Sequence, residues 1–234
     1  MGTEYRHEYK YLCDGLQLKV QETRLACLLR KDSHVGPRGS YLIRSAYFDT
    51  PENDCFRDNE DGIDPRSKYR IRIYNCSDAH IALERKVKSR TMTHKDSCAI
   101  SRQLCEEMLA GRIPAVTPDM PESLAKMLTD MRLKAMRPAV IVQYERKPFI
   151  HPTGNVRVTL DYCIASSQAF DRFFDPGMPA RQILANGQGV LEVKWDQLLP
   201  SYVKKQLQLE RLQWSAFSKY YLCRKYSFHG GTGL

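Results

Sequence analysis

Alternating hydrophobic and polar positions predict a series of strands along this chain. The pattern is clearest at residues 69–74 (YRIRIY) and 81–88 (IALERKVK), which are joined by the polar residues 75–78. Side chains on a strand point alternately to opposite faces. Each of these strands therefore has one apolar face and one charged face. The charged faces hold Arg70, Arg72, Glu84, Lys86 and Lys88.

The same alternation recurs before and after this hairpin. Further strands are expected at residues 5–13, 41–49, 139–150, 156–164 and 189–195, with another at 91–100 that includes Lys95. Their polar faces also carry ionisable and hydroxyl groups. The side chains concerned are Glu8, Lys10, Tyr144, Arg146, Arg157, Asp161, Glu192 and Lys194.

Helical spacing of apolar residues separates these strands. It predicts helices at residues 15–31, 101–111, 122–136, 200–212 and 217–228, the last of which carries Ser218 and Lys219. Ser101 is the expected N-cap of the second of these helices. A short helix is also expected to open at Thr50, with Pro51 at its first position.

About eight strands in mostly antiparallel order favour an α+β fold built on a closed barrel or a strongly curved sheet. Helices would cover the apolar outside, and the charged side chains would point inward. An ordinary antiparallel sheet with a solvated polar face gives the same alternation, so periodicity alone leaves both interpretations open. The chain of 234 residues has no long linker, so we expect a single domain over 1–234 with C-terminal helices at about 197–228.

Composition narrows the class of partner. With 36 Lys and Arg against 27 Asp and Glu, the formal net charge of +9 favours anionic partners such as nucleic acid, phosphorylated small molecules or an acidic surface. RNA recognition usually needs exposed stacking aromatics on the basic face, and few lie near these strands, so nucleic acid is disfavoured. The pattern gives no indication of the oligomeric state.

The cysteines and the apolar runs bear on location. Eight cysteines are scattered without a C-x-x-C pair, so a structural zinc site is not expected and free thiols are the simplest interpretation. There is no apolar signal segment at the start and no apolar run long enough to cross a membrane. These features predict a cytoplasmic protein without a membrane segment.

Familiar catalytic motifs are missing. The chain has no G-x-x-x-x-G-K-[ST] phosphate loop, no G-x-G-x-x-G and no G-x-S-x-G nucleophile elbow, and its histidines do not cluster. The charged strands instead interleave carboxylates with cations. Such a mixture suits a site for metal and phosphate, because a divalent ion needs oxygen ligands while phosphate oxygens need Arg and Lys donors.

Eight motifs in order resemble one family. They are HEYKY, SAYFDTPE, YRIRIY, LERKVK, QYERKPF, VRVTLD, LEVKW and FSKYYL, and they extend from about residue 4 to residue 226. Together they resemble the VTC polyphosphate polymerase domain, which belongs to the CYTH-like triphosphate tunnel metalloenzymes, in its stand-alone bacterial form. The resemblance implies an eight-stranded antiparallel tunnel that binds a triphosphate or polyphosphate with a divalent metal, Mn or Mg.

The resemblance also implies roles for individual residues. Catalytic phosphate contacts would come from Arg70, Arg72, Lys86, Arg146, Arg157 and Lys219. Further substrate contacts would come from Lys10, Lys88, Lys95, Tyr144, Lys194 and Ser218. Glu192 would be the principal metal ligand, with Glu8, Glu84 and Asp161 as further ligands.

The resulting hypothesis is a metal-dependent polyphosphate polymerase that transfers the γ-phosphate of ATP onto a growing chain. A triphosphatase that hydrolyses tripolyphosphate or a nucleoside triphosphate in the same tunnel is the alternative, because the two activities differ only in whether phosphate or water attacks. A third hypothesis, from a different class, is a non-catalytic barrel that binds RNA or another polyanion.

Overall fold

The computed structural model describes residues 6–32, 35–90, 92–208 and 211–229. Its strands are β1 (Arg6–Cys13), β2 (Arg30–Lys31), β3 (Tyr41–Asp49), β4 (Arg66–Tyr74), β5 (Ser77–Ser89), β6 (Met92–Ala99), β7 (Arg137–His151), β8 (Val156–Ser167), β9 (Arg181–Gln182) and β10 (Gly189–Trp195). Its α-helices are α1 (Gly15–Leu28), α2 (Asp54–Glu60), α3 (Arg102–Leu109), α4 (Glu122–Leu133), α5 (Ser201–Leu207) and α6 (Lys219–His229).

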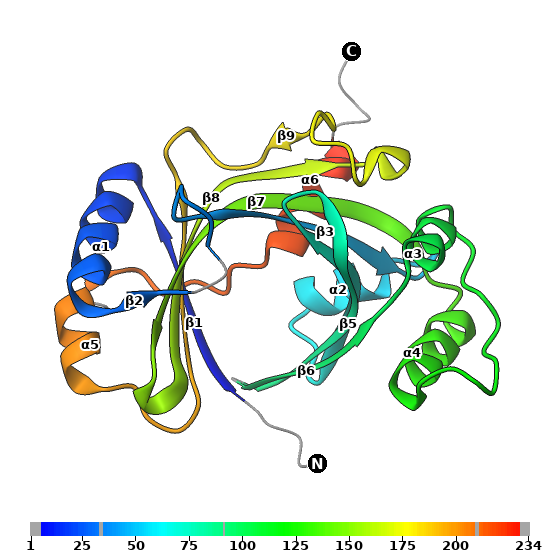
Figure 1. Ribbon diagram of the computed structural model, residues 1–234, viewed down its shortest axis with the longest axis horizontal. Helices are drawn as coiled ribbons and strands as arrows, with labels where there is room; N and C mark the ends of the chain where they lie inside the picture. Colours follow the sequence, from blue (N-terminus) through cyan, green and yellow to red (C-terminus); the bar gives the residue numbers. More distant parts are fainter. Residues whose placement is uncertain (1–5, 33–34, 91, 209–210, 230–234) are drawn as a thin grey trace.

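The strands form a closed antiparallel barrel (Figure 1). Their order is β2-β7-β3-β4-β5-β6-β1-β10-β8-β9, and an additional pairing between β7 and β8 joins the two ends of the barrel. Eight strands therefore make up the barrel wall in the described residues, while β2 and β9 are short additions. The predicted eight-stranded antiparallel barrel in an α+β fold is confirmed.

One seam of the barrel wall is short. β1 pairs with β6 only through Arg6 and His7, whereas its pairing with β10 extends along the strand. Past the short seam, residues 214–218 run along β1, and we call this segment the strap. Trp214 forms an isolated bridge with Tyr11, and the backbone N–H of Ser215 donates to the Lys10 carbonyl at 2.9 Å. The strap thus completes the wall beside β1 and leads directly into α6.

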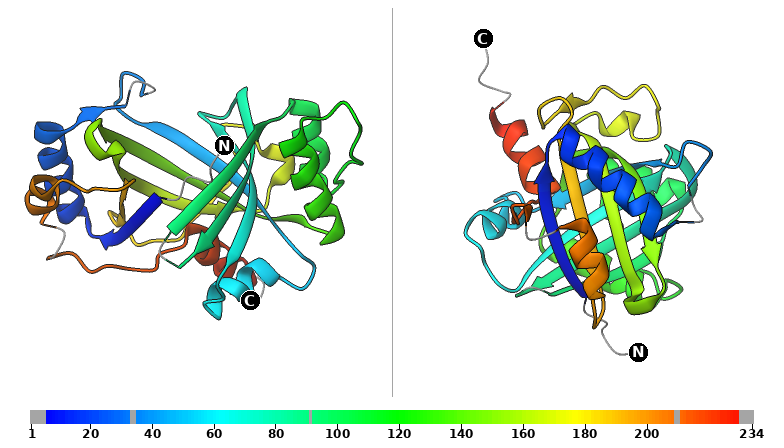
Figure 2. Two further views of the ribbon diagram at one scale, coloured as in Figure 1. Left: turned by 90° about the horizontal axis from the view of Figure 1, so that it is seen from below. Right: turned by 90° about the vertical axis from the view of Figure 1, so that its left-hand side faces the viewer.

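Helices cover the apolar outside of the barrel in three groups (Figures 1 and 2). α1 and α5 lie side by side against β1 and β10, and Leu18 and Val203 from these helices are fully buried there. α3 and α4 lie on the opposite side, where Met108 and Met127 belong to the same apolar cluster as Ile71 of β4. α6 packs on β7 and β8 and lies next to α2. The apolar faces of the strands therefore point outward.

Several predicted helix boundaries were wrong for local reasons. The helix predicted at 15–31 ends at Leu28, because the chain turns extended at Leu29 and enters β2. The helix predicted at 200–212 ends at Leu207, because Gln208 adopts a left-handed conformation with φ 48°, and residues 209–210 lie outside the described part. The last helix begins at Lys219, so Ser218 precedes it.

The short helix after β3 starts later than predicted. Pro51 lies in a turn, and α2 begins at Asp54. The Asp49 carboxylate accepts hydrogen bonds from the backbone N–H groups of Cys55 and Phe56, at 2.8 and 3.2 Å. The Tyr220 hydroxyl also donates to Asp49. Asp49 therefore caps α2 and ties it to α6.

No helix in the described ranges is long and apolar enough to cross a membrane. The eight cysteines all lie within those ranges, and each is free, as the sequence predicted.

Candidate phosphate-binding site

The charged faces of the strands point into the barrel. On β4, Arg70 and Arg72 face inward, whereas Ile71 between them is fully buried in the outer apolar cluster. On β5, Lys86 faces inward and Leu83 belongs to the same outer cluster. The solvated-sheet interpretation is therefore excluded for these strands, because their charged face lines an interior cavity.

The cavity has a volume of about 260 Å³ and reaches from the barrel interior to the strap and α2. Among the described residues, eleven Lys and Arg side chains line it against two carboxylates, Glu8 and Glu192. Twelve of the residues predicted for the site line this cavity. They are Glu8, Lys10, Arg70, Arg72, Lys86, Lys88, Tyr144, Arg146, Glu192, Lys194, Ser218 and Lys219.

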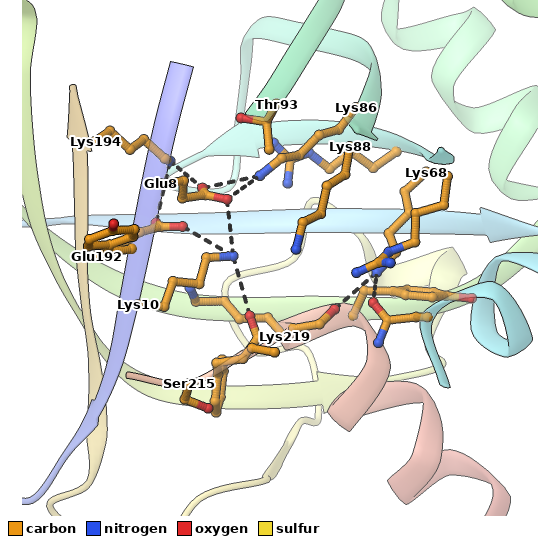
Figure 3. Close-up of a pocket in the computed structure, with 18 of the residues that line it drawn as sticks. Glu8, Lys10, Lys68, Lys86, Lys88, Thr93, Glu192, Lys194, Ser215 and Lys219 are labelled. Carbon is orange, nitrogen blue, oxygen red and sulfur yellow. Dashed lines mark hydrogen bonds and ion pairs between the residues drawn. The ribbon is translucent and has the colours of Figure 1, made fainter. Parts of the chain in front are cut away.

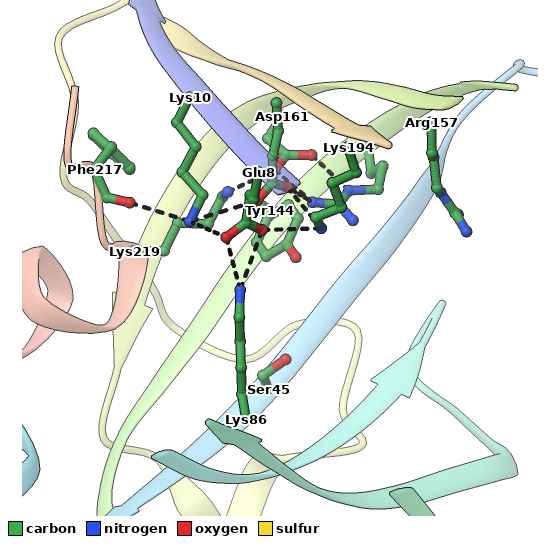
Figure 4. A network of polar contacts seen from close by, with 12 residues as sticks. Glu8, Lys10, Ser45, Lys86, Tyr144, Arg157, Asp161, Lys194, Phe217 and Lys219 are labelled. Atoms are coloured by element: carbon green, nitrogen blue, oxygen red, sulfur yellow. Dashed lines mark hydrogen bonds and ion pairs between the residues drawn. The ribbon is translucent and has the colours of Figure 1, made fainter. Parts of the chain in front are cut away.

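Glu8 is the hub of the lysine cluster (Figures 3 and 4). Its carboxylate accepts from Lys86 Nζ at 2.9 and 3.1 Å, and it lies 3.4 Å from Lys10 Nζ and 3.2 Å from Lys194 Nζ. Burial by itself would raise the pKa of Glu8, but the three lysines outweigh it and hold the pKa well below its usual range. One carboxylate cannot compensate three ammonium groups. Burial, reinforced by Lys10 and Lys194, accordingly lowers the pKa of Lys86 to about 7.

Glu192 is the second carboxylate of the cavity wall. Its oxygens lie 2.9 Å from Arg146 Nη2 and 3.5 Å from both Lys10 Nζ and Lys194 Nζ. Burial opposes ionisation, yet the surrounding cations hold its pKa well below the ordinary value. Glu192 and Glu8 share Lys10 and Lys194 as partners, so the two ionised carboxylates lie close together on the wall.

Two predicted metal ligands lie behind the cavity lining and are engaged by arginine. Asp161 is fully buried and accepts two hydrogen bonds from Arg146, each at 2.7 Å, while Lys219 Nζ lies 2.6 Å from it. Glu84 lies 2.6 Å from Arg70 Nη2 and 2.9 Å from Lys95 Nζ. Asp161 thereby orients Arg146 and Lys219, and Glu84 orients Arg70, and these three cations line the cavity.

The carboxylates on the cavity wall fit a divalent metal if substrate and water supply its other ligands. In the described part of the chain, no three His, Cys, Asp or Glu side chains converge closely enough to hold a metal by themselves. Mg²⁺ commonly binds one or two carboxylates and completes its shell with substrate phosphates and water. Glu8 and Glu192, ionised and on the cavity wall, meet that requirement.

The model of the VTC domain family matches residues 5–228. The chain belongs to the VTC domain family. A search of curated proteins by sequence returned no match.

Solved structures share the fold of this VTC domain at low identity. A proposed adenylyl cyclase from Hippeastrum, described as having a dominant triphosphatase activity, has 15% identity and a TM-score of 0.58, with 95% of each chain covered. A proposed adenylate cyclase from Bacillus halodurans has 17% identity and a TM-score of 0.52, with 90% of this chain and 89% of the other covered. These likenesses show the tunnel-type barrel fold.

Two of the predicted phosphate ligands, Arg157 and Lys95, do not line the cavity of the VTC domain. Arg157 lies apart from the lysine cluster (Figure 4), with Nη2 at 2.9 Å from Asp32 Oδ2 and donating to the Tyr41 hydroxyl at 2.9 Å. The side chain of Lys95 is 52% exposed and pairs with Glu84. Neither lines the cavity, and their phosphate-binding roles stay predictions.

Sequence reasoning missed other groups on the cavity wall of the VTC domain. They include Tyr47, Asn59, Arg66, Lys68, Arg90, Thr93 and Tyr220. For Arg66 and Lys68 the signal was present, because they precede Arg70 at even spacing and β4 begins at Arg66, three residues before the predicted start. Tyr47 lies within β3, on a strand that was predicted. The remaining residues come from the helices α2 and α6 and from the ends of β5 and β6, where no period of two marks an inward face.

Proposed function

We propose that this VTC domain is a polyphosphate polymerase that transfers the γ-phosphate of ATP onto a growing phosphate chain in the cavity. The observation that carries the proposal is the charge imbalance of the cavity lining. Eleven Lys and Arg side chains and only two carboxylates surround a cavity of about 260 Å³ in the described part of the chain. Such an excess is costly in an empty, buried site, and a bound polyanion would relieve it. Membership of the VTC family supports the same substrate class.

The residues of the wall suit phosphoryl transfer. A terminal phosphate oxygen of the chain would attack the γ-phosphorus, the bond to the β–γ bridging oxygen would break, and ADP would leave. Because the acceptor is already an oxyanion, the reaction needs no protein nucleophile. Arg70, Arg72, Lys86, Arg146 and Lys219 would hold the phosphate groups in line and stabilise the charge that develops on them.

A divalent cation, Mn or Mg, belongs to this proposal. When bound, it would neutralise phosphate charge and polarise the phosphorus–oxygen bonds. Glu8 and Glu192 would hold it together with substrate oxygens. Asp161 and Glu84 would act indirectly, because their contacts are to Arg146, Lys219, Arg70 and Lys95.

The test is to incubate the purified protein with ATP and Mn²⁺ and to analyse the products by gel for long phosphate chains and by assay for free phosphate. Chains that are absent with Arg72→Ala but present with the exposed control Lys204→Ala would support the polymerase. Release of free phosphate without chains would replace it with the triphosphatase alternative. No turnover of any triphosphate, with salt-dependent RNA binding that survives Glu192→Ala, would favour the non-catalytic barrel.

A further inference from the structure

Lys68 reaches the cavity from β4 and has only neutral partners. Its Nζ donates to Asn59 Oδ1 at 2.5 Å and to Ser218 Oγ at 3.1 Å, and it lies 4.8 Å from the centroid of the Tyr220 ring. These partners come from α2, the strap and α6. The amine is thus held in a defined position where three segments meet at the cavity wall (Figure 3).

This arrangement differs from that of the other cations deep in the cavity. Arg70, Lys86 and Arg146 each pair with a carboxylate. For Lys68, the structure shows no carboxylate within ion-pair distance in the described ranges. The charged and titratable groups that face it are Lys10 of β1, Arg66 of β4, Lys86 of β5, Cys55 of α2 and Tyr220 of α6.

The surroundings disfavour the charged form of this amine. Burial lowers the pKa of Lys68 to about 7, and the nearby charges of Lys10, Arg66 and Lys86 lower it in the same direction. At slightly alkaline pH a large fraction of Lys68 is therefore neutral when the cavity is empty.

The donor count connects charge state to binding. A neutral amine has two N–H donors, and Asn59 and Ser218 accept both. Its remaining position is a lone pair, which repels a phosphate oxygen. The ammonium form has three donors, so it keeps both contacts and has one N–H left for a ligand in the cavity. A phosphate oxygen can thus be bound by Lys68 only in the protonated state.

We propose that Lys68 is a further phosphate ligand of the cavity and that it takes up a proton when a phosphate chain binds. The proposal rests on the proposed function only in requiring that the cavity bind inorganic phosphate chains. It adds a residue outside the set implied by the family resemblance, and it makes affinity depend on pH. Below about pH 7 the amine is already charged and adds no dependence, whereas above it each binding event draws a proton from solution.

The experiment is a calorimetric titration with tripolyphosphate in EDTA, which prevents metal-dependent turnover, at several pH values between 6.5 and 8.5. Wild type is compared with Lys68→Arg, which stays charged throughout this range, and with Lys68→Met, which carries no charge. Lys86 also titrates near neutral pH and contributes in all three proteins. Lys68→Arg is the decisive comparison, because it removes the titration and keeps the charge.

We expect the slope of log Kd against pH above pH 7.5 to be steeper in wild type than in Lys68→Arg by up to about one unit, the value for one linked proton. Lys68→Met should bind roughly tenfold more weakly than wild type at pH 6.5, because a charged hydrogen bond to phosphate is lost. Melting temperatures show whether each variant folds. If Lys68→Arg does not fold, Lys68→Met provides a second measure of the slope.

Two results would overturn the proposal in different ways. Equal slopes in wild type and Lys68→Arg, with binding that Arg72→Ala weakens, would show that the cavity binds phosphate without proton uptake by Lys68. The proposed function would then stand. Absence of tripolyphosphate binding by wild type, both in EDTA and with Mn²⁺ added, would overturn both proposals together.

Discussion

Arg146 donates two hydrogen bonds to Asp161, each at 2.7 Å, and a third to Glu192 at 2.9 Å. The guanidinium is thereby fixed between a carboxylate behind the wall and a carboxylate on the wall. The Nζ atom of Lys219 also lies 2.6 Å from Asp161 Oδ2. Asp161 consequently sets the position of two cations that line the cavity without lining it itself.

We expect Asp161→Asn to destabilise the fold by roughly 3 kcal/mol, because it leaves buried cations without their compensating charge. Urea unfolding measures this loss. The exposed pair of Glu106 with Arg102 provides the matched control, and Glu106→Gln should change stability by no more than about 0.5 kcal/mol. Equal losses of stability for the two substitutions would show that the buried ion pairs of Asp161 do not stabilise the fold more than an exposed pair does.

Arg72→Ala and Lys86→Ala should each cost far more activity than stability. Lys86 shares Glu8 with two other lysines, so its removal relieves repulsion in the empty cavity. Removal of Arg72 relieves its repulsion with Arg70, and this gain offsets the loss of its hydrogen bonds to Ser45 and Tyr144. We expect a loss in kcat on the order of 100-fold, as for removal of one fixed electrostatic group. The melting temperature should change little, and tripolyphosphate should raise that of wild type by mass action. A sharp fall in melting temperature with turnover intact would make these residues structural.

Glu192→Gln should weaken metal binding, and Glu84→Gln should not. Glu192 lines the cavity, whereas Glu84 lies behind it, against Arg70 and Lys95. Electron paramagnetic resonance of Mn²⁺, with the protein and a non-hydrolysable ATP analogue, measures the bound ion directly. Retention of bound Mn²⁺ by Glu192→Gln together with its loss in Glu84→Gln would reverse the assignment.

Asp49→Asn should destabilise the protein by about 2 kcal/mol, because the carboxylate caps α2 by charge-assisted hydrogen bonds and also accepts from Tyr220. The matched control is Ser101→Ala, which removes the simpler cap of α3 and should cost about 1 kcal/mol. Urea unfolding compares the two. A smaller loss for Asp49→Asn than for Ser101→Ala would mean that the link to α6 adds nothing.

The period of two along each strand predicted most strands of the barrel and most members of their charged faces. It placed Lys86, Arg146 and Glu192 on the charged faces of their own strands, which the structure shows to line the cavity. The family resemblance, rather than periodicity, supplied the closure of the barrel and the choice between interior and solvent.

Contacts between distant segments could not be predicted in this way. Asp32 lies more than a hundred residues from Arg157, and no local pattern indicates that the pair forms and directs Arg157 away from the cavity. The strap likewise pairs with β1 through Trp214 and Tyr11, which only the folded barrel brings together. Lys68 is a different case, because β4 begins at Arg66, whereas the alternation of apolar and polar residues predicts a strand only from Tyr69.

The pairing of β1 with β10 determines when the cavity comes into existence during synthesis. His7 lies opposite Trp195, and Lys10 lies opposite Glu192, so β1 has its main partner in a strand that is synthesised more than a hundred residues after it. Pairing over such a sequence separation is slow and exposes strand edges in the meantime. Glu8 and Lys10 therefore have no partner strand until β10 has been translated, and the wall of the cavity is incomplete before then.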